Sequence, residues 1–255
     1  MTFLNINSPL EQFYVIPIFK IPFFNFIITN EVIIIFVFFS FFIFLFFSMV
    51  KPSTQSFYVI PNRWQLGLIY LYKFISYLIS TNIGGAKGQK YLPFFFSLFC
   101  YVLFLNLIGL IPFSFTFTSH IIVTIALSFS FFIGINIFGF KIHGLKMFGL
   151  FFPSGTDIFT ALLLVPIEIV SYVFRPISLS IRLFANMMAG HVLLKILAGF
   201  VWTFMHVAGF SFIIHFLPIL IILPLFILEL AVAIIQAFVF TLLTIVYLGD
   251  IIHLQ

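Results

Sequence analysis

The segment from Asp157 to Lys195 carries many ionisable and polar side chains for a stretch that is otherwise apolar. On a helix with 100° per residue, these side chains form one narrow stripe within about 40° of Arg182. The members of the stripe are Asp157, Glu168, Ser171, Arg175, Ser178 and Asn186. An ionisable group at bilayer depth costs roughly 2.5–3.5 kcal/mol. The stripe therefore predicts either a functional path through lipid or buried ion pairs that fasten helices together.

A second polar stripe lies near the C-terminus. Relative to Glu229, Gln236 and Tyr247 fall within about 20° and Asp250 within about 60° on a helix. Carboxylates and histidines exchange protons, whereas amides and phenols can hold chains of water. Two neighbouring helices with such stripes are typical of a path for water or protons.

Arg182 cannot relay protons, because a guanidinium stays protonated in proteins. It can instead attract a carboxylate and keep it ionised. The nearest acid on the same face, Glu168, is about four turns away, so we expect the partner carboxylate on another protein. Small residues beside the arginine would let that protein approach closely; they are Ser178, Ala185 and Ala189.

His191 lies about 180° round the helix from Arg182 and can face the second helix near Glu229. A proton-path role and a plain structural hydrogen bond both remain open for this histidine. For the other basic residues of these segments, snorkelling or a structural pair is the expected role; they are Arg175, Lys195, His206 and His215.

The elements that position these residues must be membrane helices. Of 255 residues, 64% are hydrophobic and 7% charged, a composition that excludes a soluble domain. We predict a single membrane domain over residues 1–255, beginning with an irregular arm at 1–30. Spans are predicted at 32–50, 92–111 and 121–140, with an interfacial amphipathic helix at 63–82 and a flexible polar connector at 80–90.

The two remaining apolar runs, 157–200 and 212–253, would each be on the order of 60 Å long as a helix, twice the hydrocarbon thickness. Either each run breaks into shorter pieces or the pair forms a long, strongly tilted hairpin.

Charge and cysteine content exclude several classes of function. Basic residues gather at 51–90 and 141–146, which places these loops on one side of the membrane and the N-terminus on the other. The net charge of +5 is thereby explained by topology and not by nucleic-acid binding. A lone Cys100 excludes a multi-cysteine metal site, and no two helices carry the spaced histidine pairs that a bis-histidine haem requires. We expect no cofactor.

The stretch SLSIRLFANMMAGH, residues 178–191, resembles subunit a of the F-type ATP synthase. The resemblance extends to IIQAFVFTLLTIVYL (234–248), NLIGLIPFSFTFTSH (106–120) and SPLEQF (8–13), and so covers nearly the whole chain. In that family the arginine of the RLFxN motif is essential, and here it is Arg182. Asn186 and Gln236 match the asparagine of this motif and the glutamine of the last helix.

The resemblance also implies roles for the other polar residues. Glu168 matches the acid of the matrix-side half-channel, and His191 and Glu229 match groups on the intermembrane-space side, as Asn186 and Gln236 do. His191 and Glu229 have exchanged places relative to many bacterial members, as in mitochondrial members, which supports the view that they face each other. Asp250 is not assigned to either half-channel. Supporting roles are expected for Arg175, Ser178 and Tyr247.

The fold that follows is an all-α polytopic membrane protein with about three conventional membrane helices, one interfacial amphipathic helix and a long, nearly horizontal C-terminal hairpin. The implied function is that of a non-catalytic proton channel beside a c-ring, in the mitochondrial inner membrane, with the C-terminus toward the matrix. Peripheral-stalk and other membrane subunits are the further partners. Two alternatives remain: a purely structural membrane subunit, and a pumping subunit of a respiratory complex, although the sequence lacks the helical repeats that the latter needs.

Overall fold

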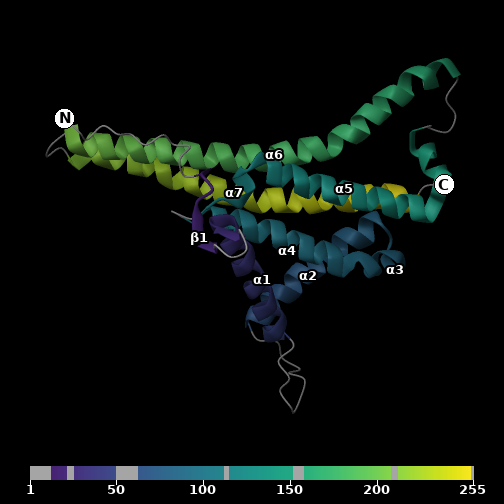
Figure 1. Ribbon diagram of the computed structural model, residues 1–255, viewed down its shortest axis with the longest axis horizontal. Coiled ribbons are helices and arrows are strands. Elements are labelled where there is room, and N and C mark those ends of the chain that lie inside the picture. Colours follow the sequence, from purple (N-terminus) through teal and green to yellow (C-terminus); the bar gives the residue numbers. More distant parts are fainter. Residues whose placement is uncertain are drawn as a thin grey trace, which may run out of the picture. The chain divides into compact units, whose positions relative to one another are not determined.

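The computed structural model describes residues 13–21, 26–49, 63–111, 115–151, 158–207 and 212–253. Within them the chain forms seven α-helices (Figure 1): α1 Asn30–Met49, α2 Arg63–Asn82, α3 Gly85–Gly88, α4 Leu92–Gly109, α5 Ile121–His143, α6 Ile158–Val207 and α7 Phe212–Ile252. Short 3-10 helices cover Gln89–Tyr91, Phe117–Ser119 and Gly144–Phe151.

Four helical segments of the described chain are long and apolar enough to cross a membrane: Gln89–Gly109, Ile121–His143, Phe159–Thr203 and Leu220–Ile252. The predicted class, an all-α polytopic membrane protein, is therefore confirmed. Pro166 and Pro176 lie inside α6 without ending it. Prolines are tolerated in membrane helices where neighbouring groups satisfy the carbonyls that they free.

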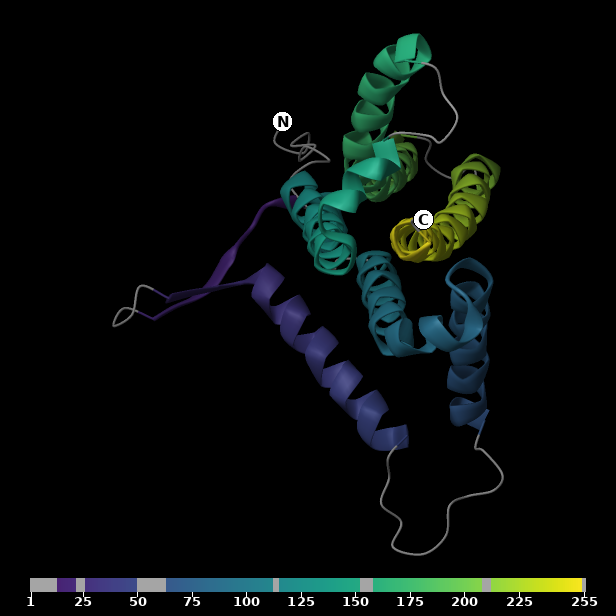
Figure 2. The same cartoon turned by 90° about the vertical axis from the view of Figure 1, so that its right-hand side faces the viewer.

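The N-terminal arm is more regular than the sequence indicates. Strands β1, Pro17–Ile21, and β2, Phe26–Thr29, pair antiparallel ahead of α1 (Figure 2). The side chain of Asn30 accepts a hydrogen bond from the Ile16 amide and donates one to the Tyr14 carbonyl, each at 3.3 Å. The expectation of an irregular segment was wrong for these residues, because aromatic and β-branched residues in both segments favour strands. Residues 1–12, with most of the SPLEQF motif, lie outside the described residues.

The chain divides into two compact units. The first unit comprises Met1–Phe39, Val102–Thr124 and Arg182–Ala237, and the second comprises Ser40–Tyr101, Ile125–Ile181 and Phe238–Gln255. Each of the two long C-terminal helices contributes one part to each unit.

In the first unit, the end of α4 packs against both long helices. Asn106 is fully buried and donates a hydrogen bond from Nδ2 to the Ala233 carbonyl of α7 at 3.2 Å. A Cβ atom on Gly109 would lie 3.0 Å from the terminal methyl group of Met187 on α6. The buried amide thus joins α4 to α7, as buried amides commonly do between membrane helices.

In the second unit, aromatic side chains join α2, α5 and α7. Phe238 lies 5.7 Å from Phe74, and Phe240 lies 6.0 Å from Phe131, measured between ring centroids. Phe240 and Ile75 are fully buried. The opposite face of α2 leaves large aromatic side chains exposed. Its position at the membrane interface stays a prediction.

The connector after α2 is not a loose linker, contrary to expectation. It forms α3 and a 3-10 turn, and its first residues contact the C-terminal end of α7, where a Cβ atom on Gly249 would lie 2.9 Å from the Asn82 carbonyl oxygen. Gly88 has no room for a side chain, since a Cβ atom there would lie 2.6 Å from Ile79 Cγ2. His253 Nε2 lies 3.1 Å from the Ile83 carbonyl oxygen. Gly84, at φ 95°, supplies the turn that only glycine adopts readily.

Candidate functional site

A histidine and a glutamate meet between α6 and α7 in the first unit. His191 Nε2 lies 3.8 Å from Glu229 Oε1, and Glu229 is only 5% exposed. The half-turn offset of His191 from Arg182 predicts this facing position, and the structure confirms it. At 3.8 Å the two atoms are too far apart for a direct hydrogen bond, and they form an ion pair only when the imidazole is protonated.

The two helices can approach here because residue 190 is glycine. A Cβ atom on Gly190 would lie 2.5 Å from Glu229 Oε1 and 2.7 Å from its carboxyl carbon. Any larger residue would therefore push the carboxylate away from His191. This role could not be predicted from the sequence, because periodicity alone does not reveal which residue a glycine faces.

The buried pair belongs to a group of polar atoms that lack hydrogen-bond partners among the described residues. The group includes both carboxylate oxygens of Glu229, Nε2 of His191 and Oδ1 of Asn106. Asn106 contacts Ala233, one turn from Glu229, and the His191 ring interacts with the backbone of Gly109. In proteins such buried polar atoms are normally satisfied by ordered water. The arrangement is chemically suited to carry protons through water and titratable groups.

A second polar group lies in the second unit and is centred on Arg175. Its Nη2 lies 3.7 Å from Glu168 Oε1, and its Nη1 lies 3.6 Å from Asp250 Oδ2. The guanidinium carbon also lies 5.1 Å from the ring centroid of Tyr247 and 5.6 Å from that of Tyr172. Asp250, which the sequence does not assign to either half-channel, thus contacts the same arginine as Glu168. Of the two roles expected for Arg175, snorkelling and a structural pair, these contacts show the pair.

Tyr172 and Asn136 are residues of this second group that sequence analysis missed. The Tyr172 hydroxyl donates a hydrogen bond to Asn136 Oδ1 of α5, which fixes the ring beside Arg175. The available signal was the spacing of three residues between Tyr172 and Arg175, which places both side chains on one helix face.

Arg182 differs from Arg175 in its surroundings. Its side chain is exposed, and no carboxylate of the described residues lies within ion-pair distance of it. The small residues predicted beside it are exposed as well; they are Ser178, Ala185 and Ala189. Asn186 and Gln236 are half-buried. The predicted face around the arginine is thus open to an approaching surface.

The remaining candidates add no further centre. Asp157 lies outside the described residues, as do the side chains of His206 and His215. Lys195 is half-buried on α6. In the part of the chain that the structure describes, no group of three or more His, Cys, Asp and Glu residues could hold a metal ion.

Comparison with known proteins gives matches over nearly the whole chain. Residues 32–249 match the family model described as "ATP synthase A chain". The "ATP synthase subunit a" of Pylaiella littoralis is 48% identical over 98% of this chain and 99% of its own length. The proteins of the same name from Chondrus crispus and Rhodospirillum rubrum are 45% and 41% identical. They match 98% of this chain in both cases, and 98% and 100% of their own lengths.

Proposed function

Since this chain belongs to the ATP synthase A chain family, we propose that it is the stationary proton-conducting subunit of a rotary ATP synthase, with two offset half-channels separated by Arg182. The observation that supports this most directly is that α6 contributes residues to two separate groups of titratable side chains. Along α6, Arg175 and His191 are about 24 Å apart on an ideal helix, and Arg182 lies between them in sequence.

The first half-channel contains His191 and Glu229, with Asn186 and Gln236 beside them. A proton enters here from the intermembrane space and is delivered to a carboxylate of the c-ring. The buried polar atoms of this group support the assignment, because water that satisfies them also provides a path for the proton. Moving one charge across the membrane is driven by about 2.3 kcal/mol per 100 mV.

The second half-channel contains Glu168 and leads to the matrix. We assign Asp250 to it as well, because both carboxylates contact Arg175. After the ring has turned, a proton leaves the rotor carboxylate and passes along these acids. Tyr247 and Ser178 support the arrangement. Arg175 contacts both acids and so keeps them close to each other.

Arg182 separates the two paths. As a fixed positive charge, it favours the ionised form of each arriving rotor carboxylate and so forces the carboxylate to release its proton. The exposed small residues around it support close contact with the c-ring. The chain itself performs no covalent chemistry and needs no cofactor. Nucleotide synthesis and hydrolysis belong to partner subunits, and peripheral-stalk subunits hold the chain against the rotor in the mitochondrial inner membrane.

Single cysteines near each titratable group test the two-path proposal. In a Cys100→Ala background, Ser171→Cys lies one turn from Glu168, and Val232→Cys lies one turn from Glu229. Oriented vesicles carrying the intact complex are treated with a membrane-impermeant methanethiosulfonate reagent from one side. We expect Ser171→Cys to react from the side of the ATPase head and Val232→Cys from the opposite side, measured by mass spectrometry.

Ala237→Cys serves as the control, because Ala237 is fully buried and is expected to react from neither side. Asp250→Cys should react from the same side as Ser171→Cys. Reaction of Ser171→Cys and Val232→Cys from one common side would contradict the two offset paths. Reaction of Asp250→Cys from the other side would contradict its assignment alone.

Gly190→Ala tests whether the spacing of His191 and Glu229 matters for proton transport. The new methyl group displaces the Glu229 carboxylate, and a misplacement of about 1 Å can lower a rate on the order of 10²-fold. We expect ATP-driven acidification of reconstituted vesicles to fall by about that factor. Alanine is favoured over glycine in a helix by ~1 kcal/mol, so loss of helix stability is not the cause.

Gly199→Ala on the same helix is the matched control. Nothing lies within 4 Å of a Cβ atom built on Gly199, so acidification should match that of the unmodified complex. Equal acidification by both glycine variants would show that close packing at residue 190 has no part in proton transport.

A further inference from the structure

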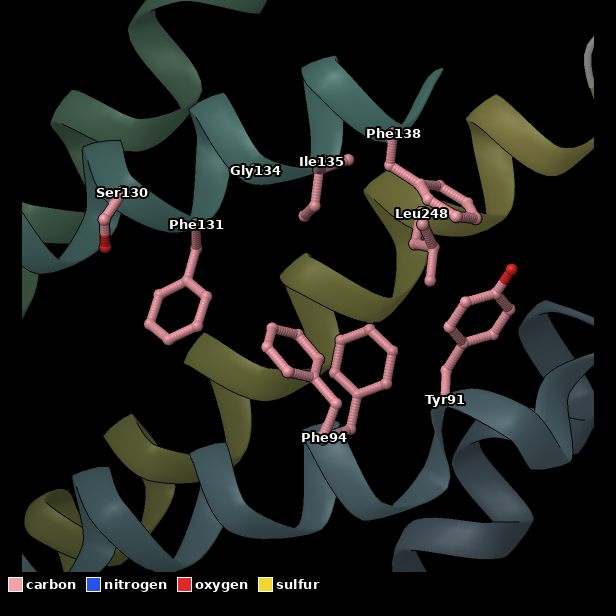
Figure 3. Close-up of a pocket in the computed structure, with 9 residues that line it drawn as sticks. Tyr91, Phe94, Ser130, Phe131, Gly134, Ile135, Phe138 and Leu248 are labelled. Atoms are coloured by element: carbon pink, nitrogen blue, oxygen red, sulfur yellow. The ribbon is translucent and has the colours of Figure 1, made fainter. Parts of the chain in front are cut away.

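A cavity of about 350 Å³ lies between α4, α5 and α7, within the second unit (Figure 3). Its wall is mainly aromatic, with Phe94 on α4 and Phe131 and Phe138 on α5. The hydroxyl of Ser130 also lines it but donates to the Leu127 carbonyl at 2.7 Å, so this hydroxyl is already satisfied. The volume is more than twice the ~150 Å³ of an apolar cavity that binds benzene. Size and lining fit a hydrocarbon chain.

The cavity is open beside Phe94, and it contains free space beside Gly134. Phe94 at its edge is 47% exposed, so a chain can enter from the surrounding lipid. Nothing lies within 4 Å of a Cβ atom built on Gly134. The glycine therefore leaves free space that a larger residue would fill.

Two lysines adjoin, in the sequence, residues that line one end of the cavity. At this end Tyr91 and Phe138 meet edge to face, with ring centroids 5.5 Å apart (Figure 3). Lys90 directly precedes Tyr91, and Lys141 follows Phe138 by about one helical turn. Both lysine side chains are exposed. The apolar cavity thus has a positively charged end.

Acidic residues do not neutralise this end. The sequence contains no Asp or Glu between Glu31 and Asp157. Asp250 follows the wall residue Leu248 by two positions, but Arg175 contacts its carboxylate at 3.6 Å. Arg175, Glu168 and Asp250 together carry at most one net negative charge, whereas Lys90 and Lys141 carry two positive charges, so an anion beside the lysines meets a positive local charge.

We propose that this cavity binds one acyl chain of an anionic phospholipid, with the lipid phosphate beside Lys90 and Lys141. The Tyr91 phenol lies at the same end as the lysines, where such rings accompany lipid headgroups in membrane proteins. Acyl chain and headgroup are recognised separately, the chain by the phenylalanine wall and the phosphate by the two lysines.

A photoactivatable phosphatidylglycerol tests the proposal on the intact complex. The probe carries a diazirine near the end of one acyl chain and is mixed into phosphatidylcholine vesicles that contain the purified complex. After irradiation, we expect the label on peptides of α4 and α5 that line the cavity. Neutralising one lysine, Lys90→Gln or Lys141→Gln, should lower labelling about fivefold, and neutralising both about 25-fold, as for basic residues beside an anionic headgroup.

Gly134→Leu fills the cavity from within and should abolish the label while leaving the lysines in place. Gly67→Leu on α2 is its matched control, since Gly67 also has nothing within 4 Å and does not line the cavity. Lys146→Gln controls for loss of an exposed positive charge elsewhere. Neither control should change the labelling.

Three results would each overturn the proposal. The first is equal labelling by a phosphatidylcholine probe of the same chain length, which would show that the anionic headgroup is not recognised. The second is unchanged labelling of Gly134→Leu, which would place the chain outside the cavity. The third is cross-linking of a photoreactive residue at position 134 to another subunit, which would identify a protein segment as the occupant.

Discussion

Arg182→Ala is expected to abolish ATP-driven proton pumping while the complex still assembles. The side chain is exposed and, among the described residues, has no carboxylate partner, so its removal leaves no buried charge unpaired within the chain. In the proposed mechanism, nothing then forces an arriving rotor carboxylate to release its proton, and protons would pass directly between the two half-channels. Acidification of reconstituted vesicles measures pumping, and subunit composition of the purified complex measures assembly.

Arg182→Lys should fail as well, because a desolvated lysine can lose its proton whereas arginine stays charged. Lys146→Ala removes another exposed cation and should leave pumping unchanged. A subunit with a purely structural role would tolerate both changes at position 182. Normal pumping by Arg182→Ala would therefore exclude the gating role and favour that alternative.

Exchanging His191 and Glu229 should be less harmful than either single change. His191→Glu places two carboxylates together, and Glu229→His places two imidazoles together, so each single variant loses the complementary pair. The double variant restores one acid and one imidazole at the same contact of 3.8 Å. Contacting residues commonly couple by about 0.5–3 kcal/mol, which corresponds to a rate recovery of about 2-fold to 10²-fold over the additive expectation.

The measurement is the initial rate of ATP-driven acidification for the unmodified complex, both single variants and the double variant. A control cycle exchanges His191 with Glu168, which contacts Arg175 and belongs to the other group. The losses in that cycle should be additive, since distant residues do not couple. Additive losses in the His191–Glu229 cycle would show that the two residues act independently.

Helical periodicity was sufficient to predict how residues on one helix are directed. It placed His191 opposite Arg182 and directed it toward Glu229, and the structure brings these two side chains together. It also indicated the exposed small residues beside Arg182. These predictions succeeded because the number of residues between two positions on an α-helix fixes the angle between the directions of their side chains.

Features that depend on the register between helices could not be predicted in this way. The contact of Asp250 with Arg175 requires knowing how far α7 is shifted along α6, and hydropathy carries no such information. The role of Gly190 likewise depends on which side chain of α7 it faces. Hydropathy also left open whether Pro166 and Pro176 break the long helix, because the outcome depends on partners for the freed carbonyls.

The two titratable groups have the same charge balance. If both carboxylates are counted as ionised, Arg175, Glu168 and Asp250 sum to one negative charge; a neutral imidazole at His191 with an ionised carboxylate at Glu229 gives the same sum. One proton brings either group to neutrality, whereas a second proton or a lost cation would leave an uncompensated charge in a medium that solvates it poorly. In the proposed two-path mechanism, each group would therefore hold one exchangeable proton at a time. Protons would then pass the two groups one by one, in step with rotor carboxylates that arrive one by one.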